Sequence, residues 1–252
     1  MGILDRFRLD GKVALVTGGS RGLGQGLALA LAEAGADVAL LDRSGCTETA
    51  ERIQAMGRRA TTITCDLLAA GPDDLNAVVD QVVAELGRLD ILVNNAGIIR
   101  RHPAIDFPKA DWDDVLQVNL TAVFHLTQAA ARVMETGSII NIASMLSFQG
   151  GINVPSYTAT KSAVAGLTKA FANEWAGRGI RVNAIAPGYM ATDNTAPLRA
   201  DAARSEAILD RIPAERWGTP DDLMGAAVFL ASDASAYVHG SVLPVDGGWL
   251  AR

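Results

Sequence analysis

Seven short runs of aliphatic and β-branched residues recur along the chain, and between them apolar residues fall three or four positions apart. The runs are VALVT from Val13, DVALLD from Asp37, TTIT from Thr61, DILVNNAG from Asp90, SIINIAS from Ser138, IRVNAIAPG from Ile180 and SVLPVDGG from Ser241. Runs that are apolar almost throughout are typical of strands buried on both faces of a parallel sheet. The spacing between them predicts amphipathic helices over residues 22–34, 72–86, 111–134, 156–177 and 220–231.

This alternation predicts an α/β fold, with a doubly wound (Rossmann) parallel sheet of seven strands and helices on both faces. No linker, repeat or low-complexity tract divides the 252 residues, so we expect a single domain over residues 1–252. Residues 189–219 interrupt the alternation between the sixth and seventh strands. Because ligands bind at the carboxyl edge of such sheets, we expect this insert to form a substrate lid.

The charge of the chain excludes several classes of partner. The formal net charge is −6 and the 22 basic residues are scattered, so we expect neither nucleic acid nor an anionic membrane surface as a partner. The first residues, MGILDRFRLDGK, are charged before any apolar run develops, and no run approaches about 18 apolar residues. With only two cysteines, Cys46 and Cys65, these features predict a cytoplasmic protein without disulfides.

Acidic residues cluster at three predicted helix starts, at residues 72–74, 111–114 and 220–222. Paired carboxylates can hold a metal or act in acid/base catalysis, but the positive end of a helix dipole also favours negative charge. We interpret these acids as helix-start residues. The three histidines have no metal-ligand spacing, so we expect no metal site and give them no catalytic role, although a substrate could touch the first; they are His102, His125 and His239.

The segment TGGSRGLG, residues 17–24, follows the first predicted strand and opens a predicted helix. A tight turn alone would explain such glycines, but Asp42 ends the second strand 18 residues after Gly24, which is the context of a dinucleotide site. Glycines let the backbone approach a pyrophosphate, whose charge then faces the helix N-terminus. The loop residues expected to hold the dinucleotide are Gly18, Ser20, Arg21, Gly22, Leu23 and Gly24.

Asp42 bears on which nicotinamide cofactor the site prefers. Its carboxylate could accept hydrogen bonds from both adenosine ribose hydroxyls, and its charge would repel a 2′-phosphate. Arg43 and Arg21 argue the other way, because either guanidinium could reach a phosphate. We therefore expect NAD as the cofactor, with NADP as the less favoured alternative.

A tyrosine and a lysine stand four residues apart in VPSYTATKSAVAG, within the helix predicted over residues 156–177. Residues with this spacing lie one above the other on the same helix face, so the spacing brings an ammonium close to a phenol. Taken alone, Tyr157 and Lys161 would more often be the edge of an amphipathic helix.

Several motifs together resemble the short-chain dehydrogenase/reductase family. They are the glycine pattern at residues 17–24, Asn94-Asn95-Ala96-Gly97, Asn119, Ser144, Tyr157-Thr158-Ala159-Thr160-Lys161 and Pro187-Gly188. They occur in order over essentially the whole chain, and their joint occurrence is highly specific. The resemblance implies an NAD(P)-dependent enzyme that moves a hydride between a substrate carbon and the nicotinamide ring.

The resemblance also implies catalytic roles. Tyr157 would exchange a proton with the substrate oxygen, although a free phenol has a pKa of about 10. The Lys161 ammonium would lower that pKa and would hold the nicotinamide ribose. Ser144 would hydrogen-bond the reacting oxygen, and Asn119 would anchor a water that relays protons to solvent.

Further cofactor contacts follow from the same resemblance. Asp66 resembles the family's adenine contact, and Thr192 its contact to the nicotinamide carboxamide. Beyond the residues already named, those implied to line the cofactor cleft are Asp66, Leu67, Asn94, Ala96, Gly97, Pro187, Gly188 and Thr192. Family members usually form tetramers through the helices that here span residues 111–134 and 156–177, so the resemblance implies a homotetramer.

The substrate pocket is expected where the segments after Gly97, Ser144 and Gly188 meet. Guanidinium groups match a carboxylate and amide side chains suit hydroxyls, so the pocket favours a sugar acid over a steroid or a fatty acyl chain. The two adjacent arginines in the segment after Gly97, Arg100 and Arg101, could equally be solvated surface residues. The candidate substrate residues are Arg100, Arg101, Ser144, Met145, Gln149, Asn153, Tyr157, Met190 and Asn194.

Segments such as SFQGG and the terminal WLAR resemble a branch of the family that acts on sugar acids. The resemblance implies interconversion of 2-dehydro-3-deoxy-D-gluconate and 3-deoxy-D-glycero-2,5-hexodiulosonate, a step in uronate-polymer catabolism, with oxidation of gluconate at carbon 5 as the near alternative. Two other classes stay open: a nucleotide-binding sensor without catalysis, and a lyase or epimerase with tightly held NAD.

Overall fold

The predicted strands form one seven-stranded sheet in which all neighbouring strands run parallel. The computed structural model describes residues 2–252. The strands are β1 (Val13–Thr17), β2 (Asp37–Asp42), β3 (Ala60–Thr64), β4 (Ile91–Asn94), β5 (Gly137–Ile142), β6 (Ile180–Pro187) and β7 (Val242–Val245). Their order in the sheet is β3-β2-β1-β4-β5-β6-β7, which confirms the predicted doubly wound α/β fold.

The direction in which the sheet grows reverses at β1. This strand pairs with β2 on one side and with β4 on the other, so the chain builds outward to β3 and then returns to the middle. The loops that leave β1 and β4 therefore diverge at the carboxyl edge of the sheet. Open α/β sheets bind their ligands in the crevice at such a reversal.

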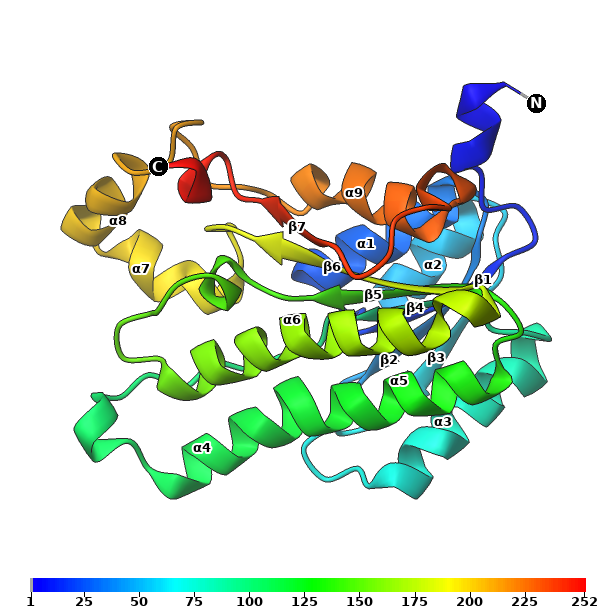
Figure 1. Cartoon of the computed structure of the whole chain (residues 1–252), viewed down its shortest axis with the longest axis horizontal. Helices are drawn as coiled ribbons and strands as arrows, with labels where there is room; N and C mark the ends of the chain where they lie inside the picture. The colour runs from blue at the N-terminus through cyan, green and yellow to red at the C-terminus, as the bar shows by residue number, and fades with distance from the viewer. Residues whose placement is uncertain (1) are drawn as a thin grey trace.

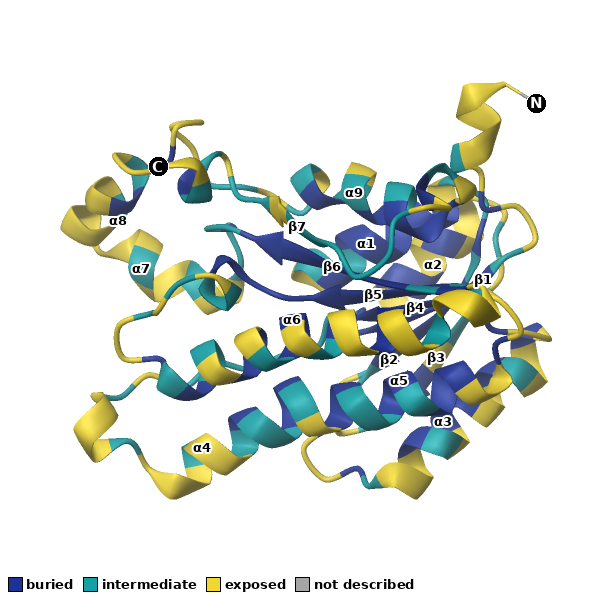
Figure 2. Cartoon of the chain, viewed as in Figure 1, coloured by how far each residue is buried: buried dark blue, intermediate teal, exposed yellow. Residues whose placement is uncertain are grey.

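Helices cover both faces of the sheet (Figure 1). One face carries α1 (Gly22–Glu33), α2 (Thr47–Ala55) and α9 (Asp221–Ala231), and the other carries α3 (Pro72–Leu86), α4 (Lys109–Leu116), α5 (Ala122–Val133) and α6 (Pro155–Trp175). The central strands between them are buried (Figure 2). Because side chains alternate along a strand, Leu15 joins the core under α3 and α5, whereas Val16 joins the core under α1 and α9.

Three segments differ from the helices predicted from the sequence. The helix predicted over residues 111–134 is α4 and α5 joined by a π-helical turn, Gln117–Thr121, a feature often found at functional sites. The helix α2 was not predicted, because it buries only three of its residues, Thr49, Ala50 and Ile53. Two short helices, α7 (Ala196–Ala200) and α8 (Ala202–Leu209), lie inside the predicted insert.

The insert at residues 189–219 packs onto the end of the molecule where the C-terminus lies (Figure 1). Ile208 and Ile212 of the insert share an apolar cluster with Met145, which follows β5, and with Trp249 near the C-terminus. The insert is therefore held against the loops at the carboxyl edge of the sheet.

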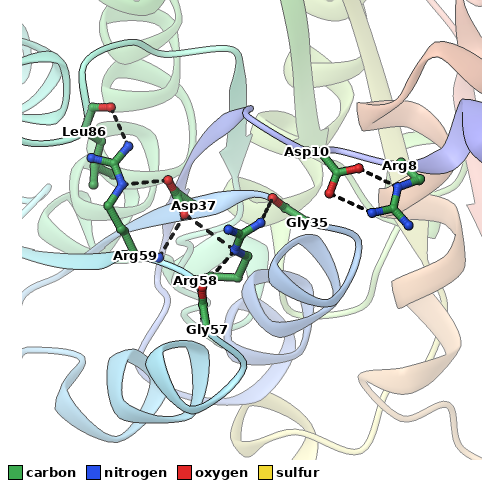
Figure 3. A network of polar contacts seen from close by, with 8 residues as sticks. All are labelled: Arg8, Asp10, Gly35, Asp37, Gly57, Arg58, Arg59 and Leu86. Atoms are coloured by element: carbon green, nitrogen blue, oxygen red, sulfur yellow. Dashed lines mark hydrogen bonds and ion pairs between the residues drawn. The ribbon is translucent and has the colours of Figure 1, made fainter.

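The amino edge of the sheet is fastened by a polar network (Figure 3). Asp37 begins β2 and accepts hydrogen bonds from the Arg59 backbone N–H at 2.9 Å and from its guanidinium at 2.8 Å. The Arg59 guanidinium also donates to the Leu86 carbonyl at the end of α3, and Arg58 donates to the Gly35 carbonyl, both at 2.9 Å. These contacts tie β2, β3 and α3 together at the edge opposite the ligand crevice.

Candidate active site

A cavity of about 630 Å³ opens at the carboxyl edge of the sheet. Its walls come from the loops after β1, β2, β3 and β4, from α6 and from the start of the insert. These segments lie far apart in the sequence and meet because the strand order reverses at β1. The volume falls in the range of roughly 300–1,000 Å³ that is usual for ligand pockets.

Close backbone contacts shape the glycine-rich loop of this cavity. Gly18 and Gly22 have φ angles of +68° and +58°, in the left-handed region that glycine adopts without strain. A Cβ atom on Gly24 would lie 2.0 Å from the Gly18 carbonyl oxygen, so a larger residue does not fit. The helix α1 begins at Gly22, and its first N–H groups, which have no partner within the helix, lie beside the cavity.

Asn95 fastens this loop to β4. Its side-chain amide donates to the carbonyl oxygens of Thr17 at 2.8 Å and Gly18 at 3.3 Å, while the Thr17 hydroxyl oxygen accepts from the backbone N–H of Asn95 at 3.0 Å. Its neighbour Asn94, predicted to line the cofactor cleft, does not line this cavity. Asn94, the last residue of β4, is 3% exposed. Its side-chain amide points into the core toward α5 and β5, where it donates to Thr127 and Asn141.

Asp42 ends β2 at the cavity with its carboxylate held by two serines. Oδ2 accepts from the Ser20 hydroxyl at 2.7 Å, and Oδ1 accepts from the Ser44 hydroxyl at 3.1 Å and its backbone N–H at 3.2 Å. Partial burial acts to raise the pKa of Asp42, but these hydrogen bonds outweigh it and hold the pKa below its ordinary value. The carboxylate is therefore ionised at neutral pH.

Tyr157 and Lys161 both line the cavity from α6, as their four-residue spacing predicts. Lys161 Nζ lies 5.5 Å from the centre of the Tyr157 ring and donates a hydrogen bond to the Ile142 carbonyl oxygen at 2.6 Å. An ammonium and a phenol therefore share one end of the cavity.

The pKa values of this pair differ from the expectation. Burial raises the pKa of the Tyr157 phenol, and the Ser144 hydroxyl and the charge of Arg101 offset this only in part. Burial also lowers the pKa of Lys161, to about 8. The predicted lowering of the Tyr157 pKa by Lys161 does not occur in this structure, because the ammonium is itself desolvated and its Nζ is turned to the Ile142 carbonyl.

The buried ammonium predicts a pH-dependent stability. The folded chain releases the Lys161 proton at a pKa of about 8, whereas an unfolded lysine does so near 10.4. Between these two pKa values only the unfolded chain holds the proton, so the free energy of unfolding rises with pH. The contribution of Lys161 is fully present above the unfolded pKa and is lost as the pH falls through about 8. Between about pH 7 and about pH 10, we expect the free energy of unfolding of the wild-type chain to rise by roughly 2 kcal/mol relative to that of Lys161→Met. Urea unfolding followed by tryptophan fluorescence measures this, and a constant difference between the two proteins would contradict it.

Ser144 and Asn119, predicted to assist Tyr157, are not among the residues that line the cavity. Ser144 follows β5, and its Oγ accepts from the Leu146 backbone N–H at 3.1 Å. Asn119 lies in the π-helical turn and pairs with the backbone of Ile98, accepting from the N–H at 2.8 Å and donating to the carbonyl at 2.9 Å. The Asn119 side chain thus fixes the loop after β4, and its water relay stays a prediction.

The two adjacent arginines have different partners. Arg100 Nε donates to Asp111 Oδ1 at 3.1 Å, and its Nη2 lies 3.5 Å from Asp114 Oδ2. Arg101 Nη2 donates to the carbonyl oxygen of Asn194 in the insert at 2.8 Å, and its charge acts on the Tyr157 hydroxyl. Over residues 2–252, no carboxylate lies within ion-pair distance of Arg101.

Most of the predicted cofactor residues line the cavity. They are Gly18, Ser20, Arg21, Gly22, Leu23, Gly24, Asp42, Arg43, Asp66, Leu67, Ala96, Gly97, Tyr157, Lys161 and Thr192. Pro187 and Gly188 lie outside the lining. A Cβ atom on Gly188 would lie 2.6 Å from the Asp246 Cα atom, so the close approach of two backbones explains this glycine.

Three of the predicted substrate residues, Arg100, Tyr157 and Asn194, line the cavity. Met145 and Met190 are buried in apolar clusters and support the walls from behind. Three others also lie outside the lining: Gln149 is half-buried, whereas Arg101 and Asn153 are exposed. The Asn153 backbone still matters, because its carbonyl accepts from the His102 N–H at 3.0 Å and joins the loops after β4 and β5.

Sequence reasoning missed several lining residues. Most are apolar or stand next to a predicted residue, so extending each predicted loop by one or two positions would have found the majority. They are Leu41, Ser44, Cys65, Leu68, Asn95, Ile98, Ile99, Val118, Ile142, Ala191 and Asp193. One of them, Asp193, forms an ion pair of 2.8 Å with Arg21, which joins the insert to the glycine-rich loop.

Two other searches of the described chain gave simple results. Residues 2–252 contain no group of three or more His, Cys, Asp or Glu side chains arranged to hold a metal ion. None of the helices in the same range is both long and apolar enough to span a bilayer.

Comparison with known proteins places this geometry in a family. The enoyl-(acyl carrier protein) reductase family model matches residues 18–250. The 2-dehydro-3-deoxy-D-gluconate 5-dehydrogenase of Escherichia coli (strain K12) is 59% identical, over 99% of this chain and 100% of that protein.

Two solved structures share the fold. A candidate 2-deoxy-D-gluconate 3-dehydrogenase from Agrobacterium tumefaciens, with bound NADP, is 55% identical with a TM-score of 0.91, over 98% of this chain and 99% of that one. A gluconate 5-dehydrogenase from Burkholderia cenocepacia J2315, in complex with NADP and tartrate, is 44% identical with a TM-score of 0.94, over 100% of both chains. The chain therefore belongs to the short-chain dehydrogenase/reductase family of oxidoreductases.

Proposed function

We propose that the protein interconverts 2-dehydro-3-deoxy-D-gluconate and 3-deoxy-D-glycero-2,5-hexodiulosonate with a nicotinamide cofactor. The observation that carries the proposal is the pairing of Tyr157 and Lys161 in a cavity whose other walls include the glycine-rich loop and Asp42. The choice of substrate is supported by the 59% identity to a 2-dehydro-3-deoxy-D-gluconate 5-dehydrogenase.

The residues of the cavity fit a nicotinamide dinucleotide. The N-terminus of α1 offers backbone N–H groups to a pyrophosphate, and no heavy atom lies within 4 Å of the position a Cβ on Gly22 would take. Asp42 offers a carboxylate to the hydroxyls of one ribose, and Lys161 offers N–H donors to those of the other. When bound, the nicotinamide ring would supply or accept a hydride.

Tyr157 supplies the proton that carbonyl reduction requires. Its raised pKa keeps the phenol protonated at neutral pH, so it can give its proton to the carbonyl oxygen as the carbonyl carbon gains a hydride. In the reverse direction the phenolate takes the proton of the alcohol. Oxidation should therefore quicken as the pH rises toward the Tyr157 pKa, whereas reduction should not.

Ser144 and Lys161 support this proton transfer. Because Ser144 Oγ already accepts a hydrogen bond from Leu146, its own hydroxyl hydrogen is left to donate to the substrate oxygen. Lys161 uses one of its three hydrogens on the Ile142 carbonyl, so it keeps donors for a ribose and for returning a proton to Tyr157.

Arg101 is the residue of this chain best suited to the substrate carboxylate. It has no carboxylate partner among the described residues, and its charge reaches the Tyr157 hydroxyl. Arg100 is already paired with Asp111 and Asp114. The proposal therefore gives the substrate carboxylate to Arg101 and leaves Arg100 as a support of the loop.

We propose NAD as the preferred cofactor, although two solved relatives are bound to NADP. The ionised Asp42 carboxylate lines the cavity and would repel a 2′-phosphate, whereas Arg43, also in the lining, is exposed and could attract one. We expect Asp42→Ala to raise the ratio of kcat/KM for NADPH over NADH by about 10-fold or more. Initial rates with each cofactor measure the ratio, and Asp73→Ala, which removes an exposed carboxylate outside the cavity, is the matched control. An unchanged ratio in Asp42→Ala would give cofactor selection to another residue.

A panel of keto and hydroxy sugar acids, assayed with reduced or oxidised NAD and NADP, tests the proposed reaction. We expect the highest kcat/KM for 2-dehydro-3-deoxy-D-gluconate and its diketo partner. The absorbance of the reduced nicotinamide gives the rates. Absence of any change in that absorbance would favour a sensor, a lyase or an epimerase instead.

Gluconate 5-dehydrogenase activity is the second candidate. It is favoured by the likeness to the gluconate 5-dehydrogenase of known structure, whose TM-score is 0.94. The two alcohol substrates differ at carbons 2 and 3, where 2-dehydro-3-deoxy-D-gluconate has a ketone and a methylene and gluconate has two hydroxyl groups. The same panel therefore separates the two activities when gluconate and 5-ketogluconate are included.

We also propose a homotetramer, a lid made by residues 189–219, a role in uronate catabolism and a cytoplasmic location. The tetramer rests on the likeness to the family, because the ring stack of Phe171 on Trp175 in α6, at 4.5 Å, belongs to the core of this chain. The lid is supported by the contacts of Asp193 and Asn194 across the cavity. Light scattering after size-exclusion chromatography tests the tetramer, and growth of a deletion strain on a uronate polymer tests the pathway.

A further inference from the structure

Asp111 in the first turn of α4 joins two residues of the loop after β4. Its Oδ1 accepts from Arg100 Nε at 3.1 Å, and its Oδ2 lies 2.6 Å from His102 Nε2. The carboxylate is 27% exposed, so both contacts are partly shielded from water. One side chain therefore holds the residues on either side of Arg101.

A helix-start role does not account for this carboxylate. In α3 and α9 the acidic residues do serve the helix start, since Asp74 accepts from the Gly71 backbone N–H at 2.8 Å and Asp222 accepts from that of Thr219 at 2.7 Å. Within the described chain, Asp111 accepts hydrogen bonds only from Arg100 and His102. The sequence-based interpretation of the acids at residues 111–114 as helix-start residues is therefore incomplete.

Arg101 reaches in another direction from its two neighbours. Its Nη2 donates to the Asn194 carbonyl in the insert, and its charge is felt at the Tyr157 hydroxyl. The His102 backbone N–H is in turn held by the Asn153 carbonyl at 3.0 Å. With the residues before and after it tied to Asp111, the backbone of Arg101 has little freedom, and its exposed guanidinium stays beside Asn194, which lines the cavity.

We propose that Asp111 is a positioning residue for the substrate, which acts by holding the segment that presents Arg101 to the substrate carboxylate. The inference rests on the proposed function, because Arg101 is the carboxylate-binding group there. Asp111 itself touches neither substrate nor cofactor in this account. A loop held in one conformation binds more tightly because less ordering is left to occur on binding.

The test compares Asp111→Ala with Asp113→Ala, a neighbour on α4 that pairs only with the exposed Lys109. We expect Asp111→Ala to raise KM for the sugar acid about 10-fold while kcat changes less than about 3-fold, and Asp113→Ala to leave both unchanged. Binding of NADH, followed by its fluorescence, should be the same in all three proteins. Arg100 remains held by Asp114 in this variant, and the isosteric Asp111→Asn replaces it if Asp111→Ala does not fold.

A double-mutant cycle with Arg101→Ala decides whether Asp111 acts through Arg101. If it does, Asp111→Ala adds less than about a 2-fold change in KM once Arg101 is already alanine. Independent effects that multiply in the double variant would overturn the inference, and so would an unchanged KM in Asp111→Ala.

Hydrogen exchange separates failure of this inference from failure of the proposed function. In the cofactor-free chain, the backbone amides of residues 98–102 should exchange faster in Asp111→Ala than in the wild type or Asp113→Ala, whatever the substrate proves to be. Unchanged exchange at these amides overturns the positioning role. If Asp111→Ala exchanges faster but the wild-type protein turns over no sugar acid, the positioning role stands and only the proposed function is contradicted.

Discussion

Replacing Tyr157 by phenylalanine is expected to lower kcat for carbonyl reduction by about 100-fold or more, because general acid catalysis contributes roughly that much. The variant loses only the hydroxyl that gives its proton to the substrate oxygen. The ring stays in place beside Lys161, whose Nζ lies 5.5 Å from its centre. Stopped-flow or steady-state assays of reduced nicotinamide give the rate.

Two controls make the result specific. Binding of NADH to Tyr157→Phe, measured by fluorescence, should change less than about 2-fold, since Lys161, Asp42 and the glycine-rich loop are untouched. Tyr237→Phe removes the hydroxyl of a fully exposed tyrosine and should keep the wild-type rate. Wild-type turnover in Tyr157→Phe would remove Tyr157 from the mechanism.

Replacing Arg101 by alanine is expected to raise KM for the sugar acid by about 10- to 100-fold, because hydrogen bonds to charged groups contribute about 1.5–3 kcal/mol. Its guanidinium is the cation near Tyr157 that lacks a carboxylate partner among residues 2–252. The KM for a neutral sugar alcohol should change little, because such a substrate offers no carboxylate to lose.

Arg100→Ala is the matched comparison, since it removes the same charge one residue away. Its guanidinium is already shared between Asp111 and Asp114, so we expect a smaller rise in KM. Equal losses on acids and neutral sugars in Arg101→Ala would argue against a carboxylate clamp. A larger effect in Arg100→Ala than in Arg101→Ala would reverse the assignment of the two residues.

The parts of the site that the sequence predicts well are those fixed by local chain geometry. Gly18 and Gly22 are required by their backbone angles and Gly24 by its contact with the Gly18 carbonyl, and both constraints act within one strand-to-helix turn. Tyr157 and Lys161 meet because they are four residues apart on α6. The order of strands and helices likewise follows from apolar periodicity alone.

The parts that could not be predicted depend on contacts between distant loops. Met145 and Met190 point into apolar clusters that include residues of α8, α9 and the C-terminus, and no local pattern fixes that direction. The partners of Arg100 and Arg101 depend on where α4 and the insert come to lie. The π-helical turn at residues 117–121 also has no clear pattern in the sequence.

The pKa of Tyr157 shows the same limit. An ammonium four residues away on a helix suggests a lowered pKa, but the sequence does not tell how deeply both groups are buried. In the structure burial dominates, raising the pKa of Tyr157 and lowering that of Lys161 to about 8. The protonated phenol that results is the form that carbonyl reduction uses.

Transfer of deuterium from NADH that carries two deuterium atoms at nicotinamide C4 tests the central claim most directly. With 3-deoxy-D-glycero-2,5-hexodiulosonate as substrate, we predict one deuterium at carbon 5 of the 2-dehydro-3-deoxy-D-gluconate formed. Mass spectrometry and proton NMR of the product locate the label. Product without deuterium, or with the label at a carbon other than carbon 5, would contradict the proposed hydride transfer.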